Sequence, residues 1–171
     1  MLRTHEQPAV AALRDERKTV SRDSPVIIDT LRICWNGSRS NHPARIASYR
    51  ALDAITCADK EGYISLYAPD GVIHDPVGMT AVDPTGAGHR GHDAVSAFWD
   101  ATVARAGGLK FIVHKSHATH DQVANSYTII PRDPCEFAGI DCIFIYRVND
   151  AGLLVYVGGY WDTPEEQELP S

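Results

Sequence analysis

The chain has 171 residues, of which 44% are hydrophobic and 22% are charged, and its formal net charge is −6 at pH 7. This length and composition predict one globular domain with a hydrophobic core, and they exclude a wholly disordered chain. An acidic chain without a run of Lys or Arg repels phosphate groups, which excludes nucleic acid as a favoured partner.

No apolar run reaches the roughly 18 residues that predict a membrane span. The apolar stretch 25–35 is interrupted by Asp29 and Arg32, and a charged segment at 14–18 precedes it, unlike the basic-then-apolar order of a secretory signal. We therefore expect a cytoplasmic protein without a membrane partner. The four cysteines lie far apart and form no CxxC pair, which favours free thiols over disulfides or a zinc site.

Residues 1–41 differ from the rest of the chain, because charged and apolar residues alternate irregularly until a turn-forming run at 36–41. We expect an N-terminal appendage that is partly disordered, with a short helix at Val10–Thr19. The sequence leaves open whether this appendage docks on the domain or on a second subunit.

Regular helical patterns begin after His42. Pro43 suits the first turn of a helix, and the apolar spacing continues this helix to about Cys57. Asp59 suits the N-cap of a second helix, which we expect to end at the Pro-Asp-Gly run 69–71.

A short strand, Val72–His74, and a loop rich in Gly and Pro, 76–91, come next. A third helix then follows and is stopped by Gly107 and Gly108. Its apolar residues recur at helical spacing and form the predicted buried stripe: Val95, Phe98, Trp99 and Val103.

The remaining segments are rich in β-branched and aromatic residues and are predicted as four strands: Phe111–His120, Ser126–Pro131, Ile140–Val148 and Leu153–Trp161. The run Asn149–Gly152 joins the last two as a hairpin. Helices followed by strands predict an α+β domain, with three helices packed on a curved antiparallel sheet and an internal pocket at the open end. We place this domain at 42–163, followed by an acidic C-terminal tail at 164–171.

One acidic residue stands out inside an apolar stretch. Asp75 is the only acidic residue between Asp70 and Asp83, and Pro76 holds it extended. A carboxylate on an apolar wall loses hydration, which raises its pKa and makes it a better base. The residues alone leave a second interpretation open, because an aspartate before proline commonly begins a turn.

The stretch Tyr67–Gly78, with the sequence YAPDGVIHDPVG, resembles the motif of bacterial ketosteroid isomerases. These belong to the nuclear transport factor 2-like superfamily, together with SnoaL-like polyketide cyclases. Gly91–Trp99 and Tyr146–Gly152 also resemble this family, and the loop 83–88 is similar to one subgroup of isomerase-like proteins. The resemblance covers 42–163 and implies a cone-shaped domain with a functional carboxylate at Asp75.

The resemblance further implies that Asp75 takes a proton from the carbon beside a ketone and returns it further along the ligand, as in ketosteroid isomerase. In that family a tyrosine and a protonated aspartate stabilise the oxyanion that forms. The ligand would be a small apolar, steroid-like or polycyclic ketone, and the simplest reaction a Δ5-to-Δ4 double-bond shift. The sequence carries no metal, flavin or nicotinamide signature, so we expect no cofactor, and the family implies a homodimer that pairs through its sheets.

The chain departs from the family at both oxyanion donors. Counting back from Asp75, the tyrosine position falls on Ala51, and Tyr49 is two residues away on another helix face. Counting back from the final hairpin, the acid position falls on Phe144, and Asp141 is three residues earlier. That odd offset places Asp141 on the opposite face of a regular strand, unless a β-bulge restores it. The candidate catalytic residues are therefore Asp75, with Tyr49 and Asp141 as possible donors.

The candidate substrate-binding residues are aromatic: Trp99, Phe144, Tyr146 and Tyr63. Trp99 matches a tyrosine that lines the family pocket, although a core role is an equal alternative for it. The histidines at 114, 117 and 120 are three residues apart on a predicted strand, so neighbouring members face opposite sides and predict no metal site.

Three functions remain in competition. The first is a steroid isomerase-like enzyme, and the second uses the same fold and base as a cyclase, dehydratase or epoxide hydrolase. The third is a non-catalytic small-molecule-binding or dimerisation module, since a fold alone does not specify a function. A deep apolar cavity around Asp75 favours the enzymes, and an Asp75 exposed on a rim favours the module.

Overall fold

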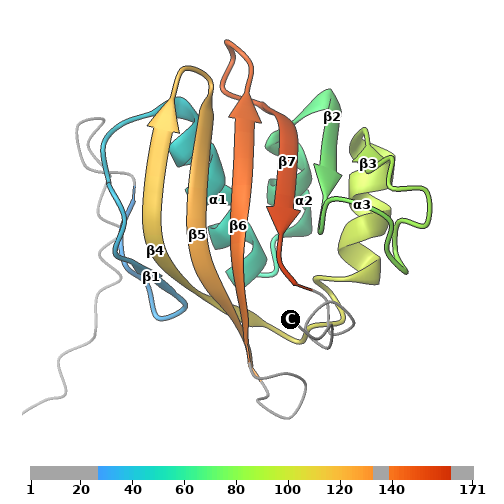
Figure 1. Ribbon diagram of the computed structural model, residues 1–171, viewed down its shortest axis with the longest axis horizontal. Helices are drawn as coiled ribbons and strands as arrows, with labels where there is room; N and C mark the ends of the chain where they lie inside the picture. The colour runs from blue at the N-terminus through green and yellow to red at the C-terminus, as the bar shows by residue number, and fades with distance from the viewer. Residues whose placement is uncertain (1–26, 133–138, 163–171) are drawn as a thin grey trace, which may run out of the picture.

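The computed structural model describes residues 27–132 and 139–162 (Figure 1). The helix expected at Val10–Thr19 and the acidic tail at 164–171 lie outside the described residues. Within them, no helix is long and apolar enough to cross a membrane.

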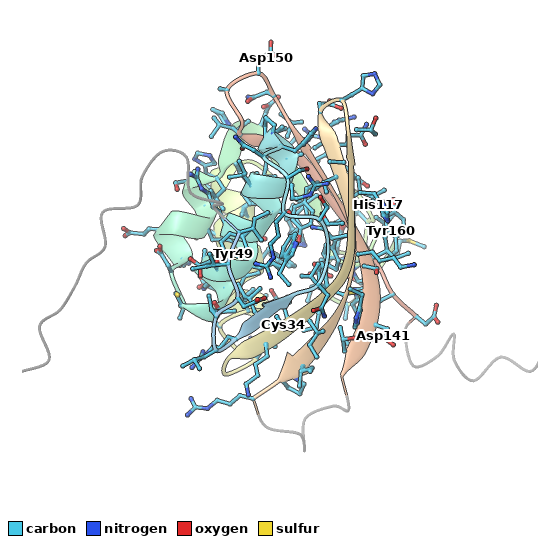
Figure 2. All side chains as sticks on the ribbon, turned by 90° about the vertical axis from the view of Figure 1, so that its left-hand side faces the viewer. Cys34, Tyr49, His117, Asp141, Asp150 and Tyr160 are labelled. Atoms are coloured by element: carbon cyan, nitrogen blue, oxygen red, sulfur yellow. The ribbon has the colours of Figure 1, made fainter. Side chains whose placement is uncertain are left out.

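The described residues form three helices and a seven-stranded sheet. The helices are α1 (Pro43–Thr56), α2 (Lys60–Ser65) and α3 (His92–Ala101). The strands are β1 (Ile33–Trp35), β2 (Tyr67–His74), β3 (His89–Arg90), β4 (Leu109–Thr119), β5 (Gln122–Pro131), β6 (Ile140–Val148) and β7 (Leu154–Tyr160). The helices gather on one face of the curved sheet (Figures 1 and 2), which confirms the predicted α+β cone.

The strand order is β1-β4-β5-β6-β7-β2-β3. β4 to β7 form the expected antiparallel series, but β2 pairs with β7 in parallel and β1 pairs with β4 in parallel. The sheet is therefore mixed rather than antiparallel throughout. Parallel pairing needs a long connection between the strands, and the helices and intervening strands supply it in both cases.

The second helix is shorter than predicted, and the strand after it is longer. α2 ends at Ser65, and β2 already begins at Tyr67, so the Pro-Asp-Gly run lies inside the strand. The pairing of β2 with β7 shifts register between Tyr67 and Val72, which accommodates Pro69 within a strand. α3 likewise ends at Ala101 and does not continue to Val103. Pairing between distant segments thus overrides the local helical pattern at Tyr67.

The described part of the N-terminal region docks on the domain, which was one of the two alternatives. β1 extends the sheet beside β4, and the side chains of Ile27, Ile33 and Trp35 are buried in the core. Asp29 accepts a hydrogen bond from the backbone N–H of Trp35 and forms an ion pair with Arg39. This segment therefore closes one end of the layer between helices and sheet.

The inner face of the sheet and the buried faces of the helices form one hydrophobic core. β6 shows the alternation most clearly, because Cys142, Phe144, Tyr146 and Val148 are buried and Asp141, Ile143 and Arg147 are exposed. Side chains of even number along β6 thus face the helices, and those of odd number face away.

Candidate active site

Asp75 lies directly after β2, where the chain leaves the sheet. The backbone N–H of Val77 donates to the carbonyl oxygen of Gly159 at 2.8 Å, which holds this part of the loop beside β7. The peptide bond between Asp75 and Pro76 is cis. Trp161, just past the end of β7, donates a hydrogen bond from Nε1 to Asp75 Oδ1 at 3.0 Å. The carboxylate is therefore held in place by a residue 86 positions away in the chain.

A cavity of about 200 Å³ lies beside Asp75, between the helices and the inner face of the sheet. Its walls are mainly aliphatic and aromatic, and Asp75 is the only charged residue among the described residues that line it. The aromatic part of the wall consists of Tyr63, Phe98, Phe111, Tyr127, Phe144, Tyr146 and Trp161. Such a cavity suits a small apolar ligand with a few polar anchoring points.

Burial raises the pKa of Asp75 from its ordinary value of 3.8 to about 6, and the hydrogen bond from Trp161 opposes part of this rise. Asp75 keeps partial exposure as a residue, but the protein around its carboxyl group removes enough water for desolvation to dominate. Near neutral pH the group is mostly ionised and remains a stronger base than an exposed carboxylate.

Four buried tyrosines form two hydroxyl pairs near Asp75. The hydroxyls of Tyr63 and Tyr67 are 2.8 Å apart, and those of Tyr127 and Tyr146 are 3.0 Å apart. Burial is the main cause that raises the pKa of all four hydroxyls, and the charge of Asp75 raises each of them further. All four therefore stay neutral and can donate hydrogen bonds at any physiological pH.

The two positions where the family carries its oxyanion donors do line the cavity, but they carry no donor. The wall contains Ala51 from α1 and Phe144 from β6, which are the positions that the sequence count indicated. Neither side chain can form a hydrogen bond. The chain therefore carries no hydrogen-bond donor at the two positions that the sequence count indicated.

Tyr49 does not reach the cavity. It is buried in α1 and packs edge-on against Trp35, with ring centroids 5.9 Å apart. The two-residue offset from Ala51 turns it to another side of the helix. In Figure 2 it lies among the helices, on the opposite side of the strands from Asp141.

Asp141 also stays outside the cavity. It is exposed on the outer face of β6, where it accepts a hydrogen bond from Thr128 Oγ1. The pairing of β5 with β6 runs without a register shift from Gln122 to Ile129, so no bulge moves Asp141 to the face of Phe144. The odd offset of three residues therefore leaves Asp141 on the opposite face of β6 from Phe144.

Of the predicted binding residues, Tyr63, Phe144 and Tyr146 line the cavity, and Trp99 does not. Trp99 is buried behind Tyr63, with ring centroids 5.1 Å apart, and its neighbour Phe98 occupies the wall. Trp99 thus supports the position of Tyr63 and takes the core role that the sequence left open.

Sequence reasoning missed the hydroxyl of Tyr127 and the hydrogen bond from Trp161 to Asp75. The alternation of β5 places Tyr127 on the same side as Val123, which predicts an inward side chain. Nothing in the sequence shows which hydroxyl it meets, since that depends on the pairing of β5 with β6 and on ring packing.

A second, open hollow of about 900 Å³ lies between the loop 76–80 and the lower parts of β6 and β7. Asp141, Ile143 and Tyr160 line it, and it shares Tyr127 and Trp161 with the inner cavity. In Figure 2 both Asp141 and Tyr160 lie on the side of the sheet that faces away from the helices.

Comparison with protein families matches residues 49–157 to the SnoaL-like domain. Comparison with curated proteins finds no match. Among solved structures, the Rv0760c protein of Mycobacterium tuberculosis is 32% identical with a TM-score of 0.65, over 72% of this chain and 93% of that one. The same protein has been crystallised with estradiol-17β-hemisuccinate.

Two further structures are similar over nearly their whole length. A Δ5-3-ketosteroid isomerase from a Mycobacterium species is 29% identical with a TM-score of 0.62, over 71% of this chain and 95% of that one. A computationally designed binder of 17-OHP is 30% identical with a TM-score of 0.64, over 72% of this chain and 93% of that one. The range matched to the SnoaL-like domain, 49–157, contains the described residues that line the cavity except Trp161.

Proposed function

Because the chain belongs to the SnoaL-like domain family, we propose that it is a cytoplasmic, cofactor-independent enzyme that moves a proton next to the ketone of a steroid-like or polycyclic ligand. Asp75 is the general base. The observation that carries this proposal is a lone carboxylate on the wall of an apolar cavity, oriented by Trp161 and with its pKa raised to about 6.

The geometry suggests how the proton moves. The hydrogen bond from Trp161 occupies Oδ1 of Asp75, so Oδ2 takes the proton from the carbon beside the carbonyl group. The electron pair of the broken C–H bond forms a C=C bond and places the negative charge on the carbonyl oxygen. Protonated Asp75 then returns the same proton to a carbon further along the conjugated system. The double bond moves, and the base is regenerated.

The character of the cavity supports a neutral, apolar substrate. Within the described parts of the chain, the one charged residue on its wall is the base itself, so an anionic substrate would be repelled by Asp75. The ligands named for two similar structures, estradiol-17β-hemisuccinate and 17-OHP, support a steroid-like skeleton for this chain as well.

Ala51 and Phe144 favour a second candidate function. Since neither side chain can stabilise an oxyanion where the family does so, the same base could instead activate water or a hydroxyl group. The protein would then be a SnoaL-like cyclase, dehydratase or epoxide hydrolase. A non-catalytic binding module is the third possibility, and in that case Asp75 would contribute only to affinity.

The test adds a Δ5-3-ketosteroid to the purified full-length chain and follows the absorbance of the conjugated enone. We expect turnover, and we expect Asp75→Asn to lower it on the order of 10²- to 10⁴-fold. Asp141→Asn is the matched control, because it makes the same change on the outer face and should leave the rate unchanged. Full activity in Asp75→Asn would dismiss Asp75 as the base. Steroid binding without turnover in the parent chain would favour the binding module.

We further propose a homodimer that pairs through the outer face of the sheet, as the family suggests. Ile143 and Tyr160 are 51% and 44% exposed on this face, beside Val77 and Met79 from the neighbouring loop. Exposed apolar side chains that lie together are typical of an interface. Light scattering should show a dimer, and Ile143→Lys should shift it toward monomer. A monomeric parent chain would contradict this arrangement.

A further inference from the structure

The enolate proposed above needs hydrogen-bond donors, and the usual two positions do not supply them. Ala51 and Phe144 line the cavity where the family carries a tyrosine and an acid. An enolate oxygen left in an apolar cavity without a donor would lose its hydration with no compensation. Among the described residues that line the cavity, the hydroxyl groups belong to Thr102, which donates to the carbonyl oxygen of Phe98, and to Tyr63, Tyr127 and Tyr146. Tyr63 is paired with Tyr67 behind it, and Tyr127 is paired with Tyr146.

The pair of Tyr63 and Tyr67 can offer one free hydroxyl proton to the cavity. Tyr67 is 1% exposed and does not line the cavity, and among the described residues the hydrogen-bond partner of its hydroxyl is the oxygen of Tyr63. Leaving that buried proton without a partner would be costly. Tyr67 therefore donates to Tyr63, and the hydroxyl proton of Tyr63, which lines the cavity, is free for a ligand.

The pair of Tyr127 and Tyr146 surrounds the position of the missing acid. The ring of Tyr127 stacks on Phe144 at 5.1 Å, and the ring of Phe144 stacks on Tyr146 at 6.1 Å. The hydroxyls of the two outer tyrosines meet each other. Both residues line the cavity, so whichever hydroxyl accepts within the pair keeps a free proton there.

We propose that Tyr63 and the Tyr127–Tyr146 pair form an oxyanion site, which binds the oxygen of a planar enolate or phenolate in place of the donors that Ala51 and Phe144 lack. This inference rests on the proposed function, because the enolate forms only when Asp75 removes a proton. The site would prefer a ketone whose oxygen can reach the tyrosines while its α-carbon lies at Asp75.

The paired arrangement makes each free hydroxyl a stronger donor. A hydroxyl that accepts one hydrogen bond is polarised and donates its own proton more readily. The tyrosines are also fixed by ring packing, Tyr63 by Trp99 and Tyr146 by Phe144, so they need no reorganisation when charge develops. Tyr63 and Tyr146 line the same cavity of about 200 Å³, so one small ligand would lie against both residues.

Binding of 2-naphthol tests the site without any turnover. This planar phenol resembles an enolate in shape and charge when it ionises, and its absorbance distinguishes phenol from phenolate. Because ionised Asp75 would repel a phenolate, the assay uses the Asp75→Asn background, in which we expect the bound form to be enriched in phenolate. Tyr63→Phe and Tyr146→Phe should each weaken binding on the order of 10- to 100-fold, since each removes one hydrogen bond to a charged group. Tyr49→Phe, a buried tyrosine outside the cavity, is the matched control and should bind as the parent does.

Asp75→Asn separates this inference from the proposed function. Removing the negative charge beside the ligand should tighten phenolate binding while it abolishes turnover. If turnover survives in Asp75→Asn but the tyrosine variants lose binding, the base is overturned and the oxyanion site stands. If Tyr63→Phe and Tyr146→Phe both bind 2-naphthol as tightly as the parent, the oxyanion site is overturned whatever Asp75 does.

A second measurement avoids substitutions that could disturb the core. Replacing the tyrosines by 3-fluorotyrosine makes every hydroxyl more acidic and changes each ring by one small atom. Phenolate binding should tighten if tyrosine hydroxyls hold the oxygen. Unchanged affinity in a folded, fluorinated protein would contradict the inference.

Discussion

The two faces of the sheet carry the same kind of acid in opposite circumstances. Asp75 lies at the inner cavity, where loss of water raises its pKa to about 6 and one indole N–H holds it. Asp141 lies on the outer face, exposed to solvent and bonded to the hydroxyl of Thr128. An aspartate becomes a useful base through its surroundings rather than through its identity. The aspartate that we propose as the base is therefore the one on the inner side of the sheet.

The largest expected difference between the faces is in turnover. Asp75→Asn should lower kcat/KM for a Δ5-3-ketosteroid on the order of 10²- to 10⁴-fold, because it removes the group that accepts the proton. Asp141→Asn should stay within about twofold of the parent. Enone absorbance at saturating and limiting substrate gives both parameters. Equal losses in the two variants would mean that the inner face has no special role.

The same two variants should differ in folding stability. A carboxylate in an ion pair stabilises the fold when it ionises, whereas ionisation of the desolvated Asp75 destabilises it. The folded pKa of Asp75 lies above its unfolded value, so folding stability is lost as pH rises from about 3.8 through about 6. Asp75→Asn should therefore raise the free energy of unfolding by about 2–3 kcal/mol near neutral pH and have little effect near pH 3.8.

Urea denaturation at several pH values measures this difference directly. The Asp141→Asn variant should show no comparable gain near neutral pH, because its carboxylate is exposed. A stability of Asp75→Asn that matches the parent at every pH would mean that the inner carboxylate is well hydrated.

Trp161 allows a narrower test, because its hydrogen bond affects the pKa of Asp75. Its hydrogen bond lowers the pKa of Asp75 against the effect of burial, so Trp161→Phe should move that pKa above 6. Since the base acts when it is ionised, kcat/KM of the parent should fall as the pH drops through about 6. In Trp161→Phe this fall in kcat/KM should occur at a higher pH. We expect a loss of roughly 10-fold near neutral pH. A limb at the same pH in both proteins would contradict the role of Trp161.

The smallest expected effect belongs to the outer face. Thr128 Oγ1 donates its one proton to Asp141 Oδ1 and accepts a hydrogen bond from His114 Nε2 at 2.8 Å. Thr128→Val keeps the shape of the side chain and removes both bonds. Because these groups remain accessible to water, the free energy of unfolding should change by less than about 1 kcal/mol, and turnover should not change. A large loss of activity would show that this hydrogen-bonded chain communicates with the cavity.

Much of the architecture followed from local patterns. The hairpin at Asn149–Gly152 forms as predicted, with Asn149 accepting from Gly152 and with a positive φ of 77° at Gly152. β6 has the predicted bounds, and its strict alternation placed Asp141 opposite to Phe144. The boundary between α2 and β2 was wrong, because Tyr67 pairs with β7 across the domain.

For the candidate site, the sequence singled out Asp75 through its apolar setting and its resemblance to ketosteroid isomerases, and counting along that resemblance gave the positions Ala51 and Phe144. Spacing along one helix or strand then predicted which side chains share a face with these positions. Only the tertiary structure decided that Trp161 holds Asp75 and that Tyr127 meets Tyr146. These contacts join segments far apart in the chain, and their formation depends on strand register and ring packing that no local pattern encodes. The environment of the carboxylate, and with it the chemistry proposed for this protein, is a property of the assembled cavity.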